Sequence, residues 1–259
     1  MGCFSGPEAI EDNLTLVLDA ANTKSYSGSG NTWYDLSGNG YDAIKTGSRV
    51  SYNSTENAWE FTGTTDTTSD GIYITELNYV TGSSDAIPNL TIESWIKCNS
   101  GTTGHTNDQR IILSYDRSAI FRYGIGSDSI SSVAGKPTFH FDTGTAYDIG
   151  ATSYSGDLRD DAWHQVCVTF DTSNVKFYID GTLVHTSTGS YGSIGSQAES
   201  ETPRYGWIGT GSEASTAGGT ISPGTLFYGF ISKINYYYKT LSDSEIAQNF
   251  NAFRSRYGV

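Results

Sequence analysis

Cysteine is scarce in this sequence, and the cysteines present form no pattern. The 259 residues include three of them, Cys3, Cys98 and Cys167, at wide spacing. Metal sites use closely spaced cysteine pairs and small secreted scaffolds use an even set of bridging cysteines, so neither is predicted. We expect Cys98 and Cys167 to be buried free thiols in strands, and we expect the chain to assemble in a reducing compartment.

Positive charge is also in short supply. Lys and Arg number 15 against 28 Asp and Glu, the formal net charge is −13, and no basic run occurs. Such a chain is poorly suited to neutralise phosphates, so nucleic acid and anionic membrane surfaces are not expected partners. No apolar run reaches the length of a transmembrane helix, so membrane insertion is not expected. Residues 1–10 have neither the basic nor the apolar part of a secretory signal.

Turn and strand residues are abundant. Thirty glycines and 13% aromatic residues fit many short strands joined by turns. The clearest stretch is residues 163–187, where apolar residues alternate in three runs separated by a polar turn at 171–174 and by Asp180-Gly181. Because Asp-Gly tolerates the positive φ angles of a tight hairpin, this stretch predicts three consecutive antiparallel strands.

Alternation of the same kind marks further strands, and one helix signal follows them. Ser242 and Glu245 form a capping box before apolar residues at helical spacing. The sequence therefore predicts an all-β fold: a two-sheet antiparallel jelly-roll sandwich at residues 13–259, with one short C-terminal helix and a polar N-terminal arm at residues 1–12. Strands are expected at 14–18, 59–61, 71–74, 90–97, 110–115, 121–125, 138–141, 205–208 and 226–238, with Phe230, Ile234 and Tyr236 pointing inward in the last.

Six blocks of sequence, in this order, resemble the concanavalin A-like lectin/glucanase superfamily, and within it the laminin-G-like jelly-roll branch. The resemblance spans nearly the whole chain and implies the sandwich fold, which hosts lectins, glycosidases, adhesion modules and virion proteins. The blocks are Leu16-Val-Leu-Asp-Ala20, Trp33-Tyr-Asp-Leu-Ser-Gly-Asn-Gly40, Leu90-Thr-Ile-Glu-Ser-Trp-Ile96, Trp163-His-Gln-Val-Cys-Val-Thr-Phe170, Val175-Lys-Phe-Tyr-Ile-Asp-Gly181 and residues 230–246.

The two ends of the chain most resemble single-domain proteins of tailed bacteriophages, notably marine ones. The matching parts are the opening at residues 18–30 and the ending at residues 249–258. This resemblance implies a non-enzymatic virion structural protein that decorates the capsid or belongs to a tail or fibre, assembled in the host cytoplasm as a homo-oligomer or in many copies. Its partners would be other virion proteins, with the N-terminal arm as an attachment segment, and host-surface glycans. The alternatives are a carbohydrate-binding lectin or adhesion module and a glycoside hydrolase.

Catalytic patterns are missing from the sequence. Glucanases of the superfamily resemble Glu-x-Asp-x-x-Glu on one strand, which places carboxylates on one face, and this spacing does not occur here. Glu199 and Glu201 fall in a loop, and a Gly-x-Ser-x-Gly elbow is absent. The sequence does not exclude a Ser/His/Asp triad that is assembled by folding. All four histidines, however, have structural or solvent-facing explanations, so no catalytic residue is predicted.

No metal ligand is assigned, although a structural calcium ion is the cofactor to weigh. Lectin-like members of the superfamily often hold one, and Asp35 in its Asp-Leu-Ser-Gly-Asn-Gly loop is the residue that resembles a contributor. Relatives commonly carry an acidic residue soon after the Gly-x-Ile of the last strand, whereas this chain has Ser232 and Lys233, and a lysine opposes a cation. The other interpretation of Asp35 is a turn residue that bonds its own backbone.

Carbohydrate binding is the ligand function that the aromatic content favours. Eighteen tyrosines and five tryptophans offer flat apolar faces on which a sugar ring can stack. Tyr123, His140 and Tyr154 are the candidate carbohydrate-binding residues, predicted to line one exposed sheet face. Aromatic residues also fill sandwich cores and subunit interfaces, and Tyr236-Tyr-Tyr238 is interpreted in that way.

Overall fold

Eighteen strands and one helix make up the described part of the chain, which is residues 8–63, 70–80, 85–101, 109–116, 118–126, 133–196, 202–222 and 225–259 of a computed structural model. No helix among these residues is long and apolar enough to cross a membrane. The elements are β1 Leu14–Asp19, β2 Thr32–Trp33, β3 Ala43–Thr46, β4 Val50–Asn53, β5 Ala58–Thr62, β6 Gly71–Val80, β7 Asn89–Cys98, β8 Arg110–Ser114, β9 Phe121–Ile125, β10 Pro137–Asp142, β11 Ala146–Gly150, β12 Trp163–Asp171, β13 Asn174–Ile179, β14 Thr182–Thr188, β15 Pro203–Ile208, β16 Gly211–Ser212, β17 Ile221–Ser222, β18 Tyr228–Tyr237 and α1 Asp243–Tyr257.

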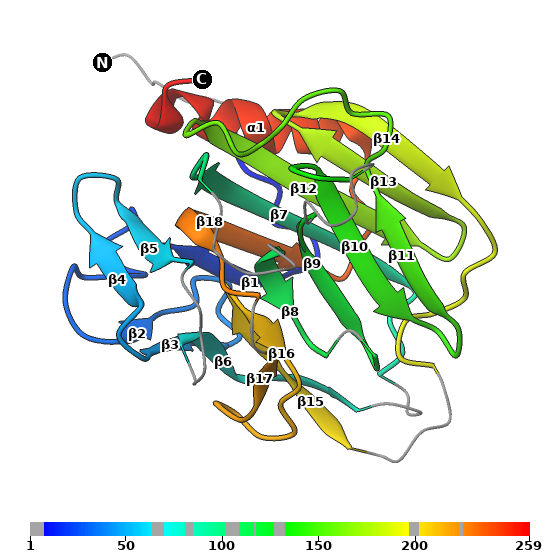
Figure 1. The fold of residues 1–259 in the computed structure, drawn as a ribbon, viewed down its shortest axis with the longest axis horizontal. Helices are drawn as coiled ribbons and strands as arrows, with labels where there is room; N and C mark the ends of the chain where they lie inside the picture. The colour runs from blue at the N-terminus through cyan, green and yellow to red at the C-terminus, as the bar shows by residue number, and fades with distance from the viewer. Residues whose placement is uncertain are drawn as a thin grey trace.

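Two eight-stranded sheets form a sandwich (Figure 1). Sheet A has the order β14-β13-β12-β7-β18-β5-β4, with β1 also paired to β18, and sheet B has the order β11-β10-β9-β8-β15-β6-β3-β2. The described pairings within both sheets are antiparallel, so the predicted all-β jelly-roll sandwich with a C-terminal helix is confirmed.

The meander predicted at residues 163–187 is β12, β13 and β14, which pair in sequence order at one end of sheet A. Asp180 and Gly181 have φ angles of 50° and 73°, the left-handed pair that a tight hairpin requires. β7, the strand predicted at residues 90–97, lies between β12 and β18, and both of its faces are covered.

The apolar residues that face between the sheets form one large core of aliphatic and aromatic side chains. Phe121, Tyr123, Phe139 and Phe141 contribute from sheet B, and their rings meet Phe170 of sheet A at centroid distances of 5.1 Å from Phe141 and 6.4 Å from Phe139. Cys98 and Cys167 are buried free thiols, as predicted, and Cys3 lies outside the described residues.

Helix α1 covers the outer face of sheet A, where it contacts β12, β14 and Trp95 of β7 (Figure 1). Its predicted capping box is present, because Ser242 Oγ accepts from Glu245 N and the Glu245 carboxylate accepts from Ser242 N. Trp95 of β7 stacks on Phe250 and Tyr257 of the helix, at centroid distances of 5.8 and 4.1 Å. The helix thus buries Trp95, the one aromatic residue of β7, which points away from the core.

Part of the predicted N-terminal arm packs against this helix. Ile10 N donates to Asn249 Oδ1 at 2.8 Å, Tyr237 Oη donates to Ile10 O at 3.1 Å, and Gln248 donates to Glu8 O at 2.7 Å. Residues 8–12 are therefore anchored between α1 and β18, and the rest of the arm lies outside the described residues. A free attachment segment would have to be shorter than the predicted residues 1–12.

Two details of the strand prediction are wrong. Thr32–Trp33, for which no strand was predicted, forms β2, which pairs with β3 at the edge of sheet B. Phe230 does not point into the core, because a register shift between Ile231 and Lys233 breaks the alternation of β18. Ile234 and Tyr236, beyond that shift, lie in the core as predicted.

Candidate functional site

The three predicted sugar-binding residues do not share a face. Tyr123 is fully buried, because it pairs with Phe139 across β9 and β10 and points into the core. His140 pairs with Arg122, one residue along each strand, so it points the opposite way. The expectation that Tyr123 lines an exposed face is therefore corrected, and its position gives a sugar no access to the ring.

His140 and Tyr154 are placed less deeply but also apart. His140 points away from Phe139 and Phe141, as predicted, but it is 9% exposed, and its Nδ1 contacts the carboxylate of Asp148 on β11. Tyr154 lies in the segment after β11 and packs its ring against the core. Burial and the nearby Asp160 carboxylate raise the pKa of Tyr154. Neither residue faces a described pocket.

The histidines show no complete catalytic triad in the described part of the chain, where His105 is not included. His164 contacts two carboxylates, with Nδ1 at 2.8 Å from Asp180 and Nε2 at 3.2 Å from Asp160, and the Asp180 contact raises its pKa despite partial burial. His185 Nδ1 lies 2.9 Å from Ser153 Oγ, and burial lowers the pKa of His185. Each pair connects neighbouring segments of backbone, as structural histidines do.

Asp35 acts as a turn residue. Its carboxylate accepts hydrogen bonds from the backbone N–H groups of Val17, Ser37 and Tyr41 and from the Ser37 hydroxyl, at 2.6–3.1 Å. A carboxylate with four protein donors has little capacity left for a cation. Among the described residues there is also no group of three His, Cys, Asp or Glu side chains suited to a metal ion.

Lys233 is buried at the position where relatives were expected to carry an acidic residue. Its ammonium group lies 3.5 Å from Asp19 Oδ2, and Arg256 binds the same carboxylate at 2.8 Å. Burial lowers the pKa of Lys233, while Asp19 opposes the shift. Two basic groups therefore surround this carboxylate, which is unfavourable for a further cation.

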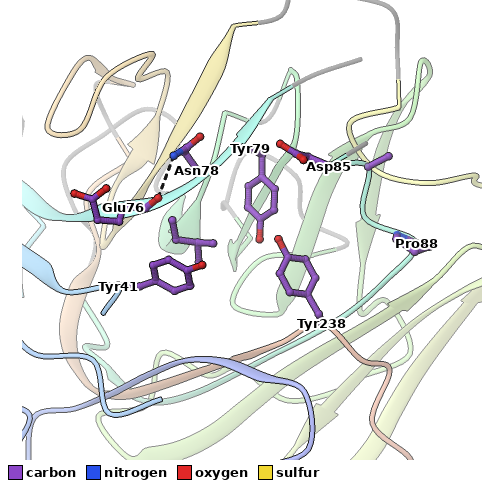
Figure 2. A pocket seen from close by; sticks show the side chains of 9 residues that line it. Tyr41, Glu76, Asn78, Tyr79, Asp85, Pro88 and Tyr238 are labelled. Atoms are coloured by element: carbon purple, nitrogen blue, oxygen red, sulfur yellow. Dashed lines mark hydrogen bonds between the residues drawn. The ribbon is translucent and has the colours of Figure 1, made fainter. Parts of the chain in front are cut away.

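A pocket of about 330 Å³ opens where the end of β6 in sheet B meets the end of β18 in sheet A. We call it the tyrosine pocket (Figure 2). It has the size of a small-molecule site. Its lining consists of Tyr41, Glu76, Leu77, Asn78, Tyr79, Asp85, Ala86, Pro88 and Tyr238.

The tyrosines of this pocket are held by contacts between the two sheets. Tyr79 is 1% exposed, and its hydroxyl donates to Tyr236 Oη across the sandwich at 2.7 Å. Tyr238 is 43% exposed, and its ring lies edge-on to Tyr79 at 6.2 Å. Partial burial raises the pKa of Tyr238 to about 12, so its phenol remains a hydrogen-bond donor at neutral pH.

Polar groups stand around these rings. Glu76 and Asp85 lie at opposite ends of the pocket, with tyrosine side chains between them (Figure 2). Asn78 donates its amide to Glu76 O at 3.0 Å, and Val80 N donates to Asp85 Oδ2 at 3.3 Å. The carboxylate of Glu76 makes no hydrogen bond or ion pair with any described residue and is solvent-exposed.

A second, smaller pocket of about 160 Å³ lies at the C-terminal end of α1. We call it the helix-end pocket, and it is lined by Ala21, Thr55, Glu56, Asn57, Trp163, Ser232, Arg256 and Tyr257. Trp163 Nε1 donates to Glu56 Oε2 at 3.1 Å, and Lys97 Nζ binds Glu56 Oε1 at 2.9 Å. Tyr257 Oη donates to Ser232 Oγ at 3.1 Å, so the polar groups of this pocket largely satisfy one another.

The tyrosine pocket is thus the better-built ligand site. Aromatic rings provide an apolar wall, and carboxylate, amide and phenol groups at its ends can bind hydroxyls, which is the arrangement that a sugar ring needs. A retaining glycosidase needs two carboxylates that converge at about 5 Å, whereas Glu76 and Asp85 stand apart (Figure 2). The sequence prediction assigned Tyr238 to a core or subunit contact and did not single out Tyr41 or Tyr79. The available signal was the position of Tyr238, which directly follows the long strand β18 and so lies at the end of the sheet.

This architecture defines a lectin-like two-sheet sandwich with a pocket at its rim. The family model described as the concanavalin A-like lectin/glucanases superfamily, of the laminin-G type, matches residues 66–247. The chain belongs to this superfamily, as its sequence blocks predicted. A search among curated proteins found no match.

Solved structures of clostridial toxin binding domains share the fold. The binding domain of Paraclostridial Mosquitocidal Protein 1 superposes with a TM-score of 0.62 at 14% identity, covering 94% of this chain and 53% of that one. A structure of botulinum neurotoxin type C, whose cell entry is described as dependent upon interaction with two ganglioside molecules, superposes with a TM-score of 0.55 at 17% identity. The match covers 94% of this chain and 52% of that one. The binding domain of botulinum neurotoxin DC, in complex with rat synaptotagmin II, superposes with a TM-score of 0.59 at 17% identity and with the same coverage of both chains. This chain therefore spans about half the length of these solved chains, and identities this low establish the fold alone.

Proposed function

We propose that this domain is a non-catalytic carbohydrate-binding module and that the tyrosine pocket is its sugar site. The observation that carries the proposal is an exposed ring, Tyr238, backed edge-on by buried Tyr79, in a pocket with the Glu76 carboxylate, which has no partner among the described residues. A sugar ring stacks on aromatic faces through its apolar surface and offers its hydroxyls to the polar groups around them.

Several features favour binding over catalysis. The two carboxylates of the pocket stand at opposite ends of it (Figure 2). The described histidines are paired with side chains outside the pocket, and Glu199 and Glu201 lie outside the described residues. The superfamily contains both binding proteins and glycosidases, so the absence of turnover is part of the proposal and requires its own measurement.

The proposal is tested by measuring affinity for a panel of immobilised and free oligosaccharides. Tyr238→Ala removes the exposed ring and should weaken binding about tenfold or more, since a lost aromatic contact of about 1.4 kcal/mol has that effect. Tyr34→Ala is the matched control, because Tyr34 is 49% exposed and lies outside the pocket. Equal affinities of the two variants would refute the assignment, and release of reducing ends from any bound oligosaccharide would refute the non-catalytic role.

The biological setting is a second proposal, which rests on the sequence resemblance to phage proteins. In it, the domain is a multicopy structural component of a virion, on the capsid or in a tail or fibre, and the glycans are those of the host surface. Image reconstruction of purified virions, with specific labelling of this chain, tests it. Regular density of this size on the shell or tail supports the proposal, and absence of the chain from purified particles leaves a lectin or adhesion module as the better account.

A further inference from the structure

The charged residues that line the tyrosine pocket are all acidic. Glu76 and Asp85 are acidic, and none of the nine lining residues is Lys, Arg or His. Arg204 pairs in register with Tyr79, but its side chain forms an ion pair at 2.9 Å with Asp116, which is not a lining residue. The chain as a whole carries a formal net charge of −13. An anionic ligand would therefore meet two carboxylates in the pocket and a repulsive long-range field on approach.

Hydrogen-bond acceptors are prominent among the polar groups as well. The amide nitrogen of Asn78 is engaged with Glu76 O, which turns its side-chain oxygen outward, and the Glu76 carboxylate offers two further acceptor oxygens (Figure 2). The side-chain donors are phenols, above all that of Tyr238. Sugar hydroxyls and ammonium groups are donors, whereas a carboxylate is an acceptor only.

From this arrangement we infer that the tyrosine pocket selects neutral and amine-bearing sugars and rejects sugars that carry a carboxylate, such as uronic and sialic acids. This inference rests on the proposed sugar-binding function of the pocket and names its ligand class. The sugar lies against the exposed ring of Tyr238, between the carboxylates of Glu76 and Asp85 at the two ends of the pocket (Figure 2). Sialylated and uronic ligands bind poorly because none of the nine described lining residues supplies a positive charge to their carboxylate.

Three oligosaccharides of equal length distinguish the possibilities: a glucosamine tetramer, an N-acetylglucosamine tetramer and a galacturonate tetramer. Their affinities are measured by calorimetry at pH 6, where the amine and the uronate are both charged, in 50 and 500 mM salt. The amine should bind at least tenfold more tightly than the uronate. Its affinity should fall severalfold at high salt, while that of the neutral tetramer stays constant.

Variants separate the pocket from the general negative charge of the chain. Glu76→Gln/Asp85→Asn should abolish the preference for the amine over the neutral tetramer without abolishing binding of the latter. The control is Glu213→Gln, which removes an exposed carboxylate outside the pocket and should leave the preference unchanged.

The possible results separate failure of the inference from failure of the function. If the galacturonate tetramer binds as tightly as the neutral one and Tyr238→Ala weakens both, the pocket binds sugars but the inferred class is wrong. If Tyr238→Ala changes no affinity, or no tetramer binds, the proposed function fails and the inference fails with it. A preference for the amine that Glu213→Gln reduces as much as the double variant would also overturn the inference, because bulk charge would then explain it.

Discussion

The tyrosine pocket and the helix-end pocket have similar compositions and different organisation. Each combines aromatic rings with a glutamate, Glu76 in the tyrosine pocket and Glu56 in the helix-end pocket. Glu56 has both oxygens engaged, by Lys97 and by the Trp163 indole, and Arg256 in the same pocket is bound to Asp19. The carboxylate of Glu76 has no such partner among the described residues, and the Tyr238 ring of the same pocket is exposed.

This difference separates a structural cluster from a candidate ligand site. A polar group that already has protein partners must lose them before it can bind a ligand, so little affinity is gained. The helix-end pocket uses its aromatic and charged side chains to fix the end of α1 on sheet A. The tyrosine pocket uses buried tyrosines to hold its wall, and its Glu76 carboxylate has no partner among the described residues. Mutations of the engaged groups of the helix-end pocket should therefore affect stability, whereas mutations of Tyr238 and Glu76 should affect binding.

The largest effect on stability is expected for Trp163→Ala. The Trp163 ring lies 5.0 Å from Tyr257 and 6.5 Å from Phe230, and its indole nitrogen binds Glu56. Because the ring is only partly buried, we expect a loss of about 2–3 kcal/mol, below the range for a fully buried tryptophan. Urea unfolding measures this loss, and sugar affinity measured on the folded variant should not change.

Trp163→Phe is the matched variant for this prediction. It keeps an aromatic ring but removes the indole nitrogen, so it should lose only part of the stability that Trp163→Ala loses. If either variant weakened sugar binding tenfold while remaining folded, the helix-end pocket would be a ligand site and the comparison would be reversed.

Tyr79→Phe is expected to have the next largest effect. It removes the hydroxyl that bonds Tyr236 between the two sheets and leaves the Tyr236 hydroxyl buried without this donor. The expected loss is about 1–2 kcal/mol in thermal or urea unfolding. Sugar affinity should fall by less than in Tyr238→Ala, because the Tyr79 ring remains as the pocket wall. An affinity loss greater than that of Tyr238→Ala would mean that the hydroxyl itself contacts the ligand.

Glu56→Gln should cost about 1 kcal/mol at neutral pH, since the Glu56 ion pair with Lys97 is about three-quarters buried. The hydrogen bond from Lys97 is the main cause of the lowered pKa of Glu56. A carboxylate with a lowered pKa stabilises the fold above its ordinary pKa of 4.5, and this contribution is lost as the pH falls through the folded-state pKa. The difference between wild type and variant should therefore shrink between pH 5 and 3 in unfolding measurements, and a constant difference over that range would contradict the assignment.

The sequence predicted the fold well because its strands carry strong local signals. The alternation in residues 163–187, the Asp180-Gly181 turn and the capping box at Ser242 each depend on neighbouring residues only, and all three are present. Short edge strands such as β2 and β4 lack such signals. They exist because a neighbouring strand offers hydrogen bonds, which is information that the local sequence does not contain.

The candidate site could not be predicted in the same way. Tyr123 and His140 were placed on one face, but the alternation within each strand does not reveal the register between β9 and β10, and that register puts them on opposite faces. Tyr123 alternates with Phe121 and Ile125, so the three side chains share one face of β9. Because the other two are large and apolar, this pattern could have placed Tyr123 in the core. Tyr238 belongs to the tyrosine pocket only because β18 ends beside β6, a contact between segments about 160 residues apart that only the tertiary fold creates.

The smallest effect on stability is expected for Glu76→Gln. The Glu76 side chain is exposed, and its carboxylate makes no hydrogen bond or ion pair with the described residues, so the free energy of unfolding should change by less than about 0.5 kcal/mol. Glu56→Gln in the helix-end pocket is the matched change, with the same chemistry in a carboxylate that is engaged. Urea unfolding of both variants in parallel therefore measures what the protein contacts of a pocket glutamate contribute. If Glu76→Gln were as destabilising as Glu56→Gln, the Glu76 carboxylate would be part of the structure, and its assignment as a group available to a ligand would be wrong.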